Sequence, residues 1–188
     1  MKGASKLVRF SYDDRLRMME VGMRRVLGIV VGTLALLSGG GCASPQPTDH
    51  QKALEEAARQ DVQAELSRYY TDLSARKWNA FSTHFWPGAT ITTIWQPPGE
   101  PAERVATVTV PEFIANAPAG PDSKPIFEER MKSCDIRVSG ELAQAWARYD
   151  ARFGEPGKVS EWSGTDAFTL MKHDGAWRIV SLVFASDE

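Results

Sequence analysis

The segment WSGTDAFTLMKHDGAWRIVSL, residues 162–182, carries the clearest indication of the fold class of this chain. Its Asp174-Gly175 pair is a strong β-hairpin signal, because both residue types tolerate the positive φ angles of a tight turn. We predict antiparallel strands on either side, over about residues 160–172 and 176–186. One face of the first strand carries alternate residues, namely Trp162, Gly164, Asp166, Phe168 and Leu170. The segment therefore predicts a sheet with one buried side.

Two more long strands are predicted before this hairpin, over about residues 126–138 and 142–153. Ser139-Gly140 separates them, and a turn from Gly154 to Gly157 leads into the next strand. One face of the second strand carries Ala143, Ala145, Ala147, Tyr149, Ala151 and Phe153. The small side chains on this face would leave space beneath the sheet, which indicates a pocket.

Helical periodicity precedes the sheet. Thr48 and Gln51 fit a capping box, Asp49 is a second cap candidate, and a helix is predicted from there to about Leu73. Its apolar positions are spaced by three or four residues, and they are Leu54, Ala58, Val62, Leu66, Tyr69 and Leu73. A second helix over about residues 75–85 is predicted to stop at Pro87-Gly88.

The middle of the chain is predicted to hold shorter elements. These are strands over about residues 89–95 and 105–110 and a short helix over 111–117. Together the elements predict an α+β fold, in which a curved antiparallel sheet packs on two to three N-terminal helices.

The N-terminal region has the layout of an export signal. Arg24 and Arg25 precede an apolar run of 12 residues, Val26 to Leu37, which is shorter than the about 20 residues of a membrane span. Small residues then lead to Cys42, which resembles the lipobox of bacterial lipoproteins, although Gly39 stands where that pattern usually has Leu. The resemblance implies cleavage before Cys42 and acylation of its thiol. A plain cleaved signal and an uncleaved anchor are the alternatives.

We therefore expect a signal region over residues 1–41, a lipid-anchored linker over 42–52 and a single domain over 53–188. The stretch before Met23 has no role in this layout, which suggests that the start codon was assigned too early. The expected location is the cell envelope, with the protein attached to the membrane through its lipid and facing the periplasm or the exterior.

The charge of the chain excludes one class of partner. Seven of the 22 basic residues but only three of the 24 acidic residues precede Cys42, so the remainder has a formal net charge of -6. A nucleic-acid partner would require a basic surface. The three histidines lack the spacing of metal ligands, and the sequence lacks a Gly-rich phosphate loop, so we expect neither a metal nor a cofactor.

The order of elements over residues 53–188 resembles the nuclear-transport-factor-2-like superfamily, which includes SnoaL-like proteins and ketosteroid isomerase. The resemblance is carried by ARYDARF (147–153), by residues 162–182 and by RYYTDLSARKWNAFSTHFWPGATITT (68–93). It implies a cone-shaped sheet around a pocket. It does not imply one function, because this superfamily contains enzymes, binding modules and assembly domains.

Ketosteroid isomerase gives a sharper comparison. A gap-free alignment of residues 68–93 places its oxyanion tyrosine on Tyr69 and its general base on Thr93. Its second oxyanion donor, a protonated aspartic acid, falls on Asp166. A threonine hydroxyl cannot accept a proton from carbon near neutral pH. The resemblance therefore implies two hydrogen-bond donors to an oxyanion, Tyr69 and Asp166, without a general base.

Asp166 interrupts an apolar stripe, and a buried carboxyl needs a partner or a proton. It is either a pocket acid with a raised pKa or a structural group bonded to Tyr69, Tyr149 or an arginine. His84, near the end of the second helix, is a general-base candidate that could equally be a surface residue or a cap. The predicted ligand-binding residues are Tyr69, Thr93, Trp95, Tyr149, Trp162, Asp166 and Phe168.

These observations leave three functional hypotheses. The first is a non-catalytic envelope lipoprotein that binds a small apolar or amphipathic molecule. The second is a lyase, isomerase or hydrolase that uses Asp166 and Tyr69, with or without His84. The third is an assembly module that forms a homodimer through the outer sheet face, where the alternation places Trp146.

Overall fold

The computed structural model describes residues 48–95 and 101–187. The predicted signal region, the lipid attachment at Cys42 and most of the predicted linker lie outside these residues. Among the residues described, no helix combines the length and the apolar character that a membrane crossing requires.

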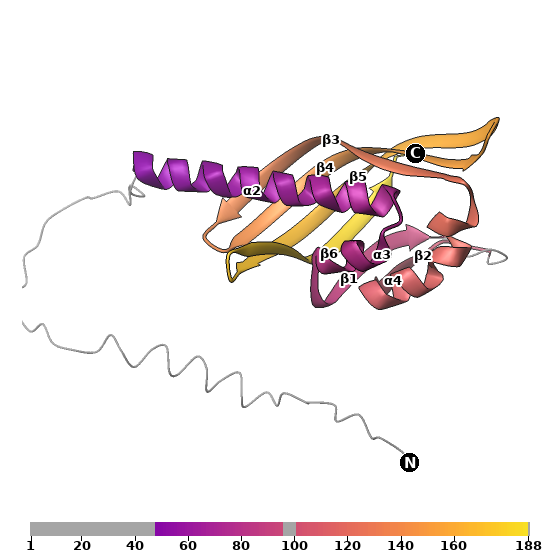
Figure 1. Cartoon of the computed structure of the whole chain (residues 1–188), viewed down its shortest axis with the longest axis horizontal. Coiled ribbons are helices and arrows are strands. Elements are labelled where there is room, and N and C mark those ends of the chain that lie inside the picture. Colours follow the sequence, from indigo (N-terminus) through magenta and orange to yellow (C-terminus); the bar gives the residue numbers. More distant parts are fainter. Residues whose placement is uncertain (1–47, 96–100, 188) are drawn as a thin grey trace, which may run out of the picture. The chain divides into compact units, whose positions relative to one another are not determined.

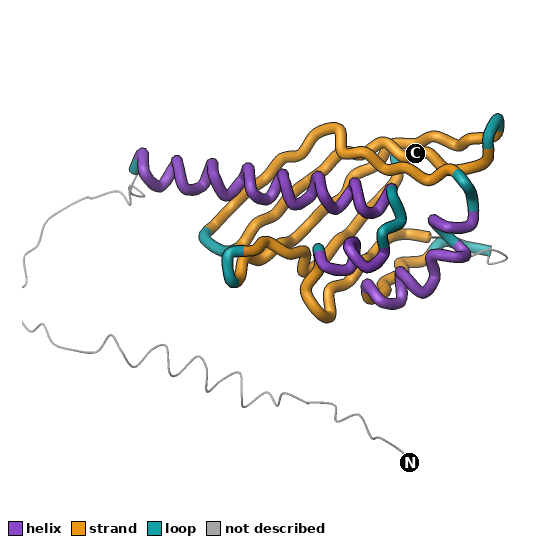
Figure 2. Tube along the Cα trace, viewed as in Figure 1, coloured by secondary structure: helices purple, strands orange, loops and turns teal. Residues whose placement is uncertain are grey.

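A six-stranded sheet forms the body of the domain, with strand order β2-β1-β6-β5-β4-β3. Its strands are β1 (Phe85–Trp95), β2 (Arg104–Thr109), β3 (Ile126–Ser139), β4 (Leu142–Glu155), β5 (Lys158–His173) and β6 (Ala176–Ser186). The last four form the predicted antiparallel meander, joined by short turns (Figure 2). The predicted α+β fold with a curved sheet is confirmed (Figure 1).

The sheet is mixed rather than wholly antiparallel. β1 runs antiparallel to β2 but parallel to β6, with Ile91 opposite Leu182. This parallel pair joins segments about 90 residues apart, so no local turn motif in the sequence predicts the pairing.

The long helix α2 (Asp49–Ser74) lies along the concave face of the sheet (Figure 1). The predicted capping box at its start is confirmed, since the Gln51 backbone N–H donates to Thr48 Oγ1 at 3.2 Å. Its buried residues are Val62, Glu65, Leu66, Tyr69, Tyr70 and Leu73. Leu54 was expected on this apolar face, yet it is 57% exposed, because the first turns of α2 extend beyond the sheet (Figure 1).

The second helix is shorter than predicted. α3 spans Trp78–Thr83, after a turn in which Arg76 has a positive φ of 54°. The His84 carbonyl accepts a hydrogen bond from the Ile179 N–H at 2.8 Å, and Phe85 pairs with Ile179 in β6. Strand pairing therefore begins where the local sequence favours another helical turn, and Pro87-Gly88 lies inside β1 instead of ending a helix.

The predicted short helix is present as α4 (Val110–Asn116). It has a capping box of its own, formed by Thr109 and Glu112, with Pro111 in the first turn. Two 3₁₀ turns, Ala117–Ala119 and Pro121–Ser123, lead from it into β3.

The core lies between the concave sheet face and the helices. The predicted alternation in β4 is confirmed, because Ala145 and Ala147 are completely buried whereas Trp146, between them, is 60% exposed. Fully buried Leu66, Phe81 and Phe168 join α2, α3 and β5 in one cluster. Each such side chain contributes about 2 kcal/mol of transfer free energy to folding.

Candidate functional site

Asp166 is the most deeply buried acidic residue among the described residues, at 3% exposure. It points to the concave face of β5, between Gly164 and Phe168, as the alternation predicted. Its Oδ2 accepts a hydrogen bond of 2.5 Å from the Tyr70 hydroxyl. Among the described residues its other oxygen, Oδ1, has no hydrogen-bond partner and is available to a ligand.

The tyrosine that reaches Asp166 is Tyr70 rather than its neighbour Tyr69. Both residues are buried on α2, at 3% exposure each, and their rings meet edge to face at 5.0 Å. The Tyr69 ring packs among Phe81, Phe85 and Phe168. The alignment with ketosteroid isomerase placed the donor at Tyr69, but the rotation of α2 over the sheet gives that hydrogen bond to the next residue.

A partly open cavity of about 170 Å³ lies beside Asp166, under the curved sheet. Apolar and aromatic side chains form most of its wall, and no lysine or arginine lines it. Its lining residues are Tyr69, Leu73, Ile91, Phe113, Pro121, Phe127, Glu129, Asp166, Leu182 and Phe184. Such a wall with a few polar groups is typical of small-molecule sites.

Glu129 is the cavity residue that the sequence analysis missed. It lies on β3 opposite Ala151 of β4, so it shares the concave face with the predicted pocket stripe. The spacing of Phe127, Glu129 and Met131 by two residues was the signal that could have identified it. Among the described residues its carboxyl group has no hydrogen-bond or ion-pair partner.

The pKa values of both cavity carboxyl groups are raised to near neutral pH. Burial raises the pKa of Asp166 to about 7, against the opposing effect of the Tyr70 hydrogen bond. Burial, and then the charge of Asp166, raise the pKa of Glu129 to about 8. Each group can therefore donate or accept a proton in the physiological range.

Tyr149 lies on β4 outside the cavity lining and depends on a glycine for its position. It is 2% exposed and lies opposite Gly164 on β5. A Cβ atom added to Gly164 would lie 2.3 Å from the Tyr149 hydroxyl oxygen and 2.5 Å from the Ala185 carbonyl oxygen. Only glycine leaves room for the phenol there, and burial raises the pKa of Tyr149.

The other predicted ligand-binding residues are spread more widely. Phe168 is buried in the core, and Trp162 is half-buried against it. Thr93 is half-buried on β1, two residues from the cavity residue Ile91, and its hydroxyl donates to the Ile94 carbonyl at 3.3 Å. The side chain of Trp95 lies outside the described part of the structure.

His84 occupies the C-cap of α3 but is buried rather than solvent-facing, at 5% exposure. Its Nδ1 lies 2.7 Å from Glu65 Oε1 and its Nε2 lies 3.1 Å from Asp72 Oδ2. Burial opposes protonation, but the two carboxylates outweigh it and raise the pKa of His84. His84 does not line the cavity, so its role is to tie α3 to α2.

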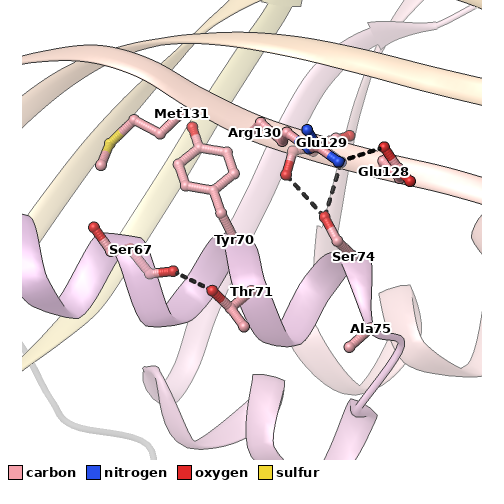
Figure 3. A pocket seen from close by; sticks show the side chains of 9 residues that line it. All are labelled: Ser67, Tyr70, Thr71, Ser74, Ala75, Glu128, Glu129, Arg130 and Met131. Carbon is pink, nitrogen blue, oxygen red and sulfur yellow. Dashed lines mark hydrogen bonds and ion pairs between the residues drawn. The ribbon is translucent and has the colours of Figure 1, made fainter.

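A second, larger hollow of about 480 Å³ lies at the surface between α2 and β3 (Figure 3). Its polar groups are largely paired with one another, as Ser74 Oγ with the Glu129 backbone at 2.8 Å and Arg130 with Glu128 at 3.0 Å. Glu129 borders both hollows. We regard the inner cavity as the better candidate site, because its carboxyl groups retain unpartnered oxygen atoms.

Over residues 48–95 and 101–187, no cluster of three or more His, Cys, Asp or Glu could hold a metal ion.

Comparison with known families gives one match. The model of a family described as "Putative lumazine-binding" matches residues 57–185. A search of curated proteins finds no match.

Solved structures with the same fold are numerous, and three represent them. Rv3472, a protein of unknown function from Mycobacterium tuberculosis, has a TM-score of 0.60 at 16% identity, covering 75% of this chain and 77% of its own. A nuclear transport factor 2-like superfamily protein from Salmonella enterica has a TM-score of 0.55 at 14% identity, with coverages of 71% and 93%. The hexachlorocyclohexane dehydrochlorinase LinA-type3 from Novosphingobium barchaimii has a TM-score of 0.56 at 14% identity, with coverages of 71% and 88%. At these identities the likeness shows the fold alone.

Proposed function

The chain belongs to this lumazine-binding-like family, and from that premise we propose that it binds a small, largely apolar molecule in the cavity beside Asp166. The observation that carries the proposal is a partly open, largely apolar cavity whose lining includes two carboxyl groups with oxygen atoms that no protein group bonds among the described residues. Its volume of about 170 Å³ is similar to the roughly 150 Å³ of an engineered cavity that binds benzene. A ligand with a single ring fits this volume.

Asp166 supplies the specificity of this site. With a pKa of about 7, its carboxyl is close to half protonated at neutral pH. The Tyr70 hydroxyl occupies Oδ2, so Oδ1 can donate to a ligand oxygen when protonated and accept from a ligand N–H or O–H when ionised. The apolar wall strengthens either hydrogen bond, because it excludes competing water.

Binding of one-ring compounds is tested by thermal shift and calorimetry on the purified protein. Asp166→Asn should weaken binding of a hit about tenfold, the effect of roughly 1.4 kcal/mol in a hydrogen bond to the ligand. Asp150→Asn is the matched control, because Asp150 lies on β4 and pairs with Lys132 at 2.9 Å, away from the cavity lining. A hit whose affinity is the same in both variants would place its site elsewhere.

We propose further that this domain is carried by a lipoprotein of the cell envelope. The proposal is supported by the basic, apolar and small-residue segments that lead to Cys42. Replacement Cys42→Ser removes the acylated thiol, so the variant should appear in the soluble periplasmic fraction. Recovery of the variant in the membrane fraction, at the level of the unchanged protein, would refute the lipid anchor.

A proton-transferring lyase or isomerase is a second candidate, and Glu129 is the observation that favours it. The sequence offered two donors without a base, whereas the structure adds a cavity carboxyl that can accept a proton near pH 8. A dehydrochlorinase has the same fold. The test is incubation of a cavity ligand in D₂O, with mass spectrometry of its C–H positions. Exchange that Glu129→Gln abolishes supports an enzyme, and absence of exchange supports a binding domain.

A further inference from the structure

The charge balance of the cavity narrows the class of ligand. Two of its ten lining residues are acids and none is a base, while four are aromatic. An anionic ligand would lie against two groups of its own sign without a compensating cation. A neutral ligand compensates the charge of neither acid, whereas a cationic ligand can pair with an ionised carboxylate.

Glu129 is positioned to accept a cation. Its backbone N–H and carbonyl are both held by Ser74 Oγ at 2.8 Å, which fixes β3 to the end of α2 (Figure 3). Its carboxyl group lines the cavity and has no protein partner among the described residues. Glu129 is half-buried, and withdrawing a carboxyl from water without a partner is unfavourable, so a positively charged ligand group would offset this cost.

Two basic side chains lie close to the cavity but outside its lining. Arg76 lies 5.8 Å from the centre of the Phe127 ring, forms an ion pair with Asp122 at 3.6 Å and donates to the Lys124 carbonyl at 2.7 Å, while its buried Nε has no hydrogen-bond partner among the described residues. Arg130 lies in the surface groove, where it pairs with Glu128 at 3.0 Å (Figure 3). Neither lines the cavity, so neither neutralises Glu129 there.

We propose that the preferred ligand of the cavity is a small ring compound with a basic nitrogen, bound as a cation against Glu129. This inference rests on the proposed ligand-binding function and names its ligand class. The ammonium or protonated ring nitrogen donates to the Glu129 carboxylate, which is a charge-assisted hydrogen bond. Four aromatic side chains also line the cavity, namely Tyr69, Phe113, Phe127 and Phe184, and aromatic rings attract cations.

Binding of this kind moves a proton and changes no covalent bond of the ligand. Near pH 7 most of the free protein carries a proton on Glu129, because the pKa of that group is about 8. When a protonated amine binds, the Glu129 O–H bond breaks and its proton passes to the buffer. The other titratable groups that interact with Glu129 are Asp166 and the phenols of Tyr69, Tyr70 and Tyr149, and burial raises the pKa of each phenol, which keeps it neutral.

The test is calorimetry of the full chain with benzylamine, benzyl alcohol and benzoate at pH 7. These three probes share one ring and differ in charge. We expect benzylamine to bind at least tenfold more tightly than benzyl alcohol, and benzoate to bind most weakly. Buffers with different ionisation enthalpies should reveal release of most of one proton with benzylamine and none with benzyl alcohol.

Variants assign the effect to Glu129. Glu129→Gln should weaken benzylamine at least tenfold and leave benzyl alcohol within about twofold, which also reports that the variant is folded. Glu128→Gln is the matched control, because Glu128 faces the groove and should leave all three affinities unchanged. Equal affinities for benzylamine and benzyl alcohol would overturn the cation preference while leaving the cavity as a binding site. Failure of all three probes to bind would count against the proposed function itself.

Discussion

Replacing Asp166 by Asn should make the protein more stable at pH 8 while leaving it nearly unchanged at pH 4. Asn has the shape of the protonated acid and can still accept the hydrogen bond from Tyr70. The wild-type carboxyl, in contrast, must ionise as the pH rises. Its folded-state pKa is about 7 and its ordinary value is 3.8.

The magnitude follows from this difference in pKa. Between pH 4 and pH 7 the folded protein retains the Asp166 proton and the unfolded chain does not, so the free energy of unfolding falls as the pH rises. A shift of about three units at 1.36 kcal/mol per unit corresponds to about 4 kcal/mol. Asp166→Asn does not undergo this decrease in the free energy of unfolding. The substitution also removes the Asp166 charge, which helps to raise the pKa of Glu129.

Urea unfolding followed by far-ultraviolet circular dichroism at pH 4, 6 and 8 measures this effect. The free energy of unfolding of the variant minus that of the wild type should grow by about 4 kcal/mol over this range. Asp150→Asn should change in the opposite direction, because hydrogen bonds from Lys132 and Ser163 lower the pKa of Asp150. Parallel stability curves for the wild type and Asp166→Asn would refute the view that Asp166 is buried with a retained proton.

Three further outcomes are expected. Tyr70→Phe removes the hydrogen bond that lowers the pKa of Asp166, so a carbon-13 titration of that carboxyl should shift to higher pH. Gly164→Ala places a methyl group 2.3 Å from the Tyr149 hydroxyl oxygen and should destabilise the fold by about 2 kcal/mol in urea unfolding. His84 has a raised pKa, so its stabilising charge is present below its ordinary pKa of about 6.5 and is lost as the pH rises through the folded value. His84→Gln should therefore lower the free energy of unfolding by about 3 kcal/mol at pH 6 and by less at pH 9.

Burial of Asp166 lowers the stability of the fold as the pH rises, and the fold itself does not require an acid at this position. An apolar residue of similar size at this position would avoid the loss of stability above pH 4. Carboxyl groups kept in such surroundings are frequent at functional sites, where the altered pKa serves binding or proton transfer. The stability measurement therefore also bears on function, because it establishes how unfavourable the cavity is for an uncompensated charge.

The meander, its turns and the two faces of its strands could be predicted from the sequence. Local chemistry specifies these features, since Asp174-Gly175 fixes a hairpin and the side-chain period of two fixes which residues point inward. The burial of Asp166 and of the alanine stripe followed directly from this pattern. The start of α2 could also be predicted, because its capping box is formed by two residues close in sequence, Thr48 and Gln51.

The set of groups that meet in the cavity depends on tertiary packing and could not be predicted from the sequence. Tyr69 and Tyr70 are both buried, and the angle at which α2 crosses the sheet determines that Tyr70 reaches Asp166, 96 residues away in the chain. Glu129 enters the site because β3 pairs in register with the inward face of β4. The parallel pairing of β1 with β6 ends α3 early and brings Ile91 to the cavity beside Leu182. These contacts depend on packing between distant segments. The spacing of two residues in β3 indicates the face on which Glu129 lies, but not that this face meets Asp166.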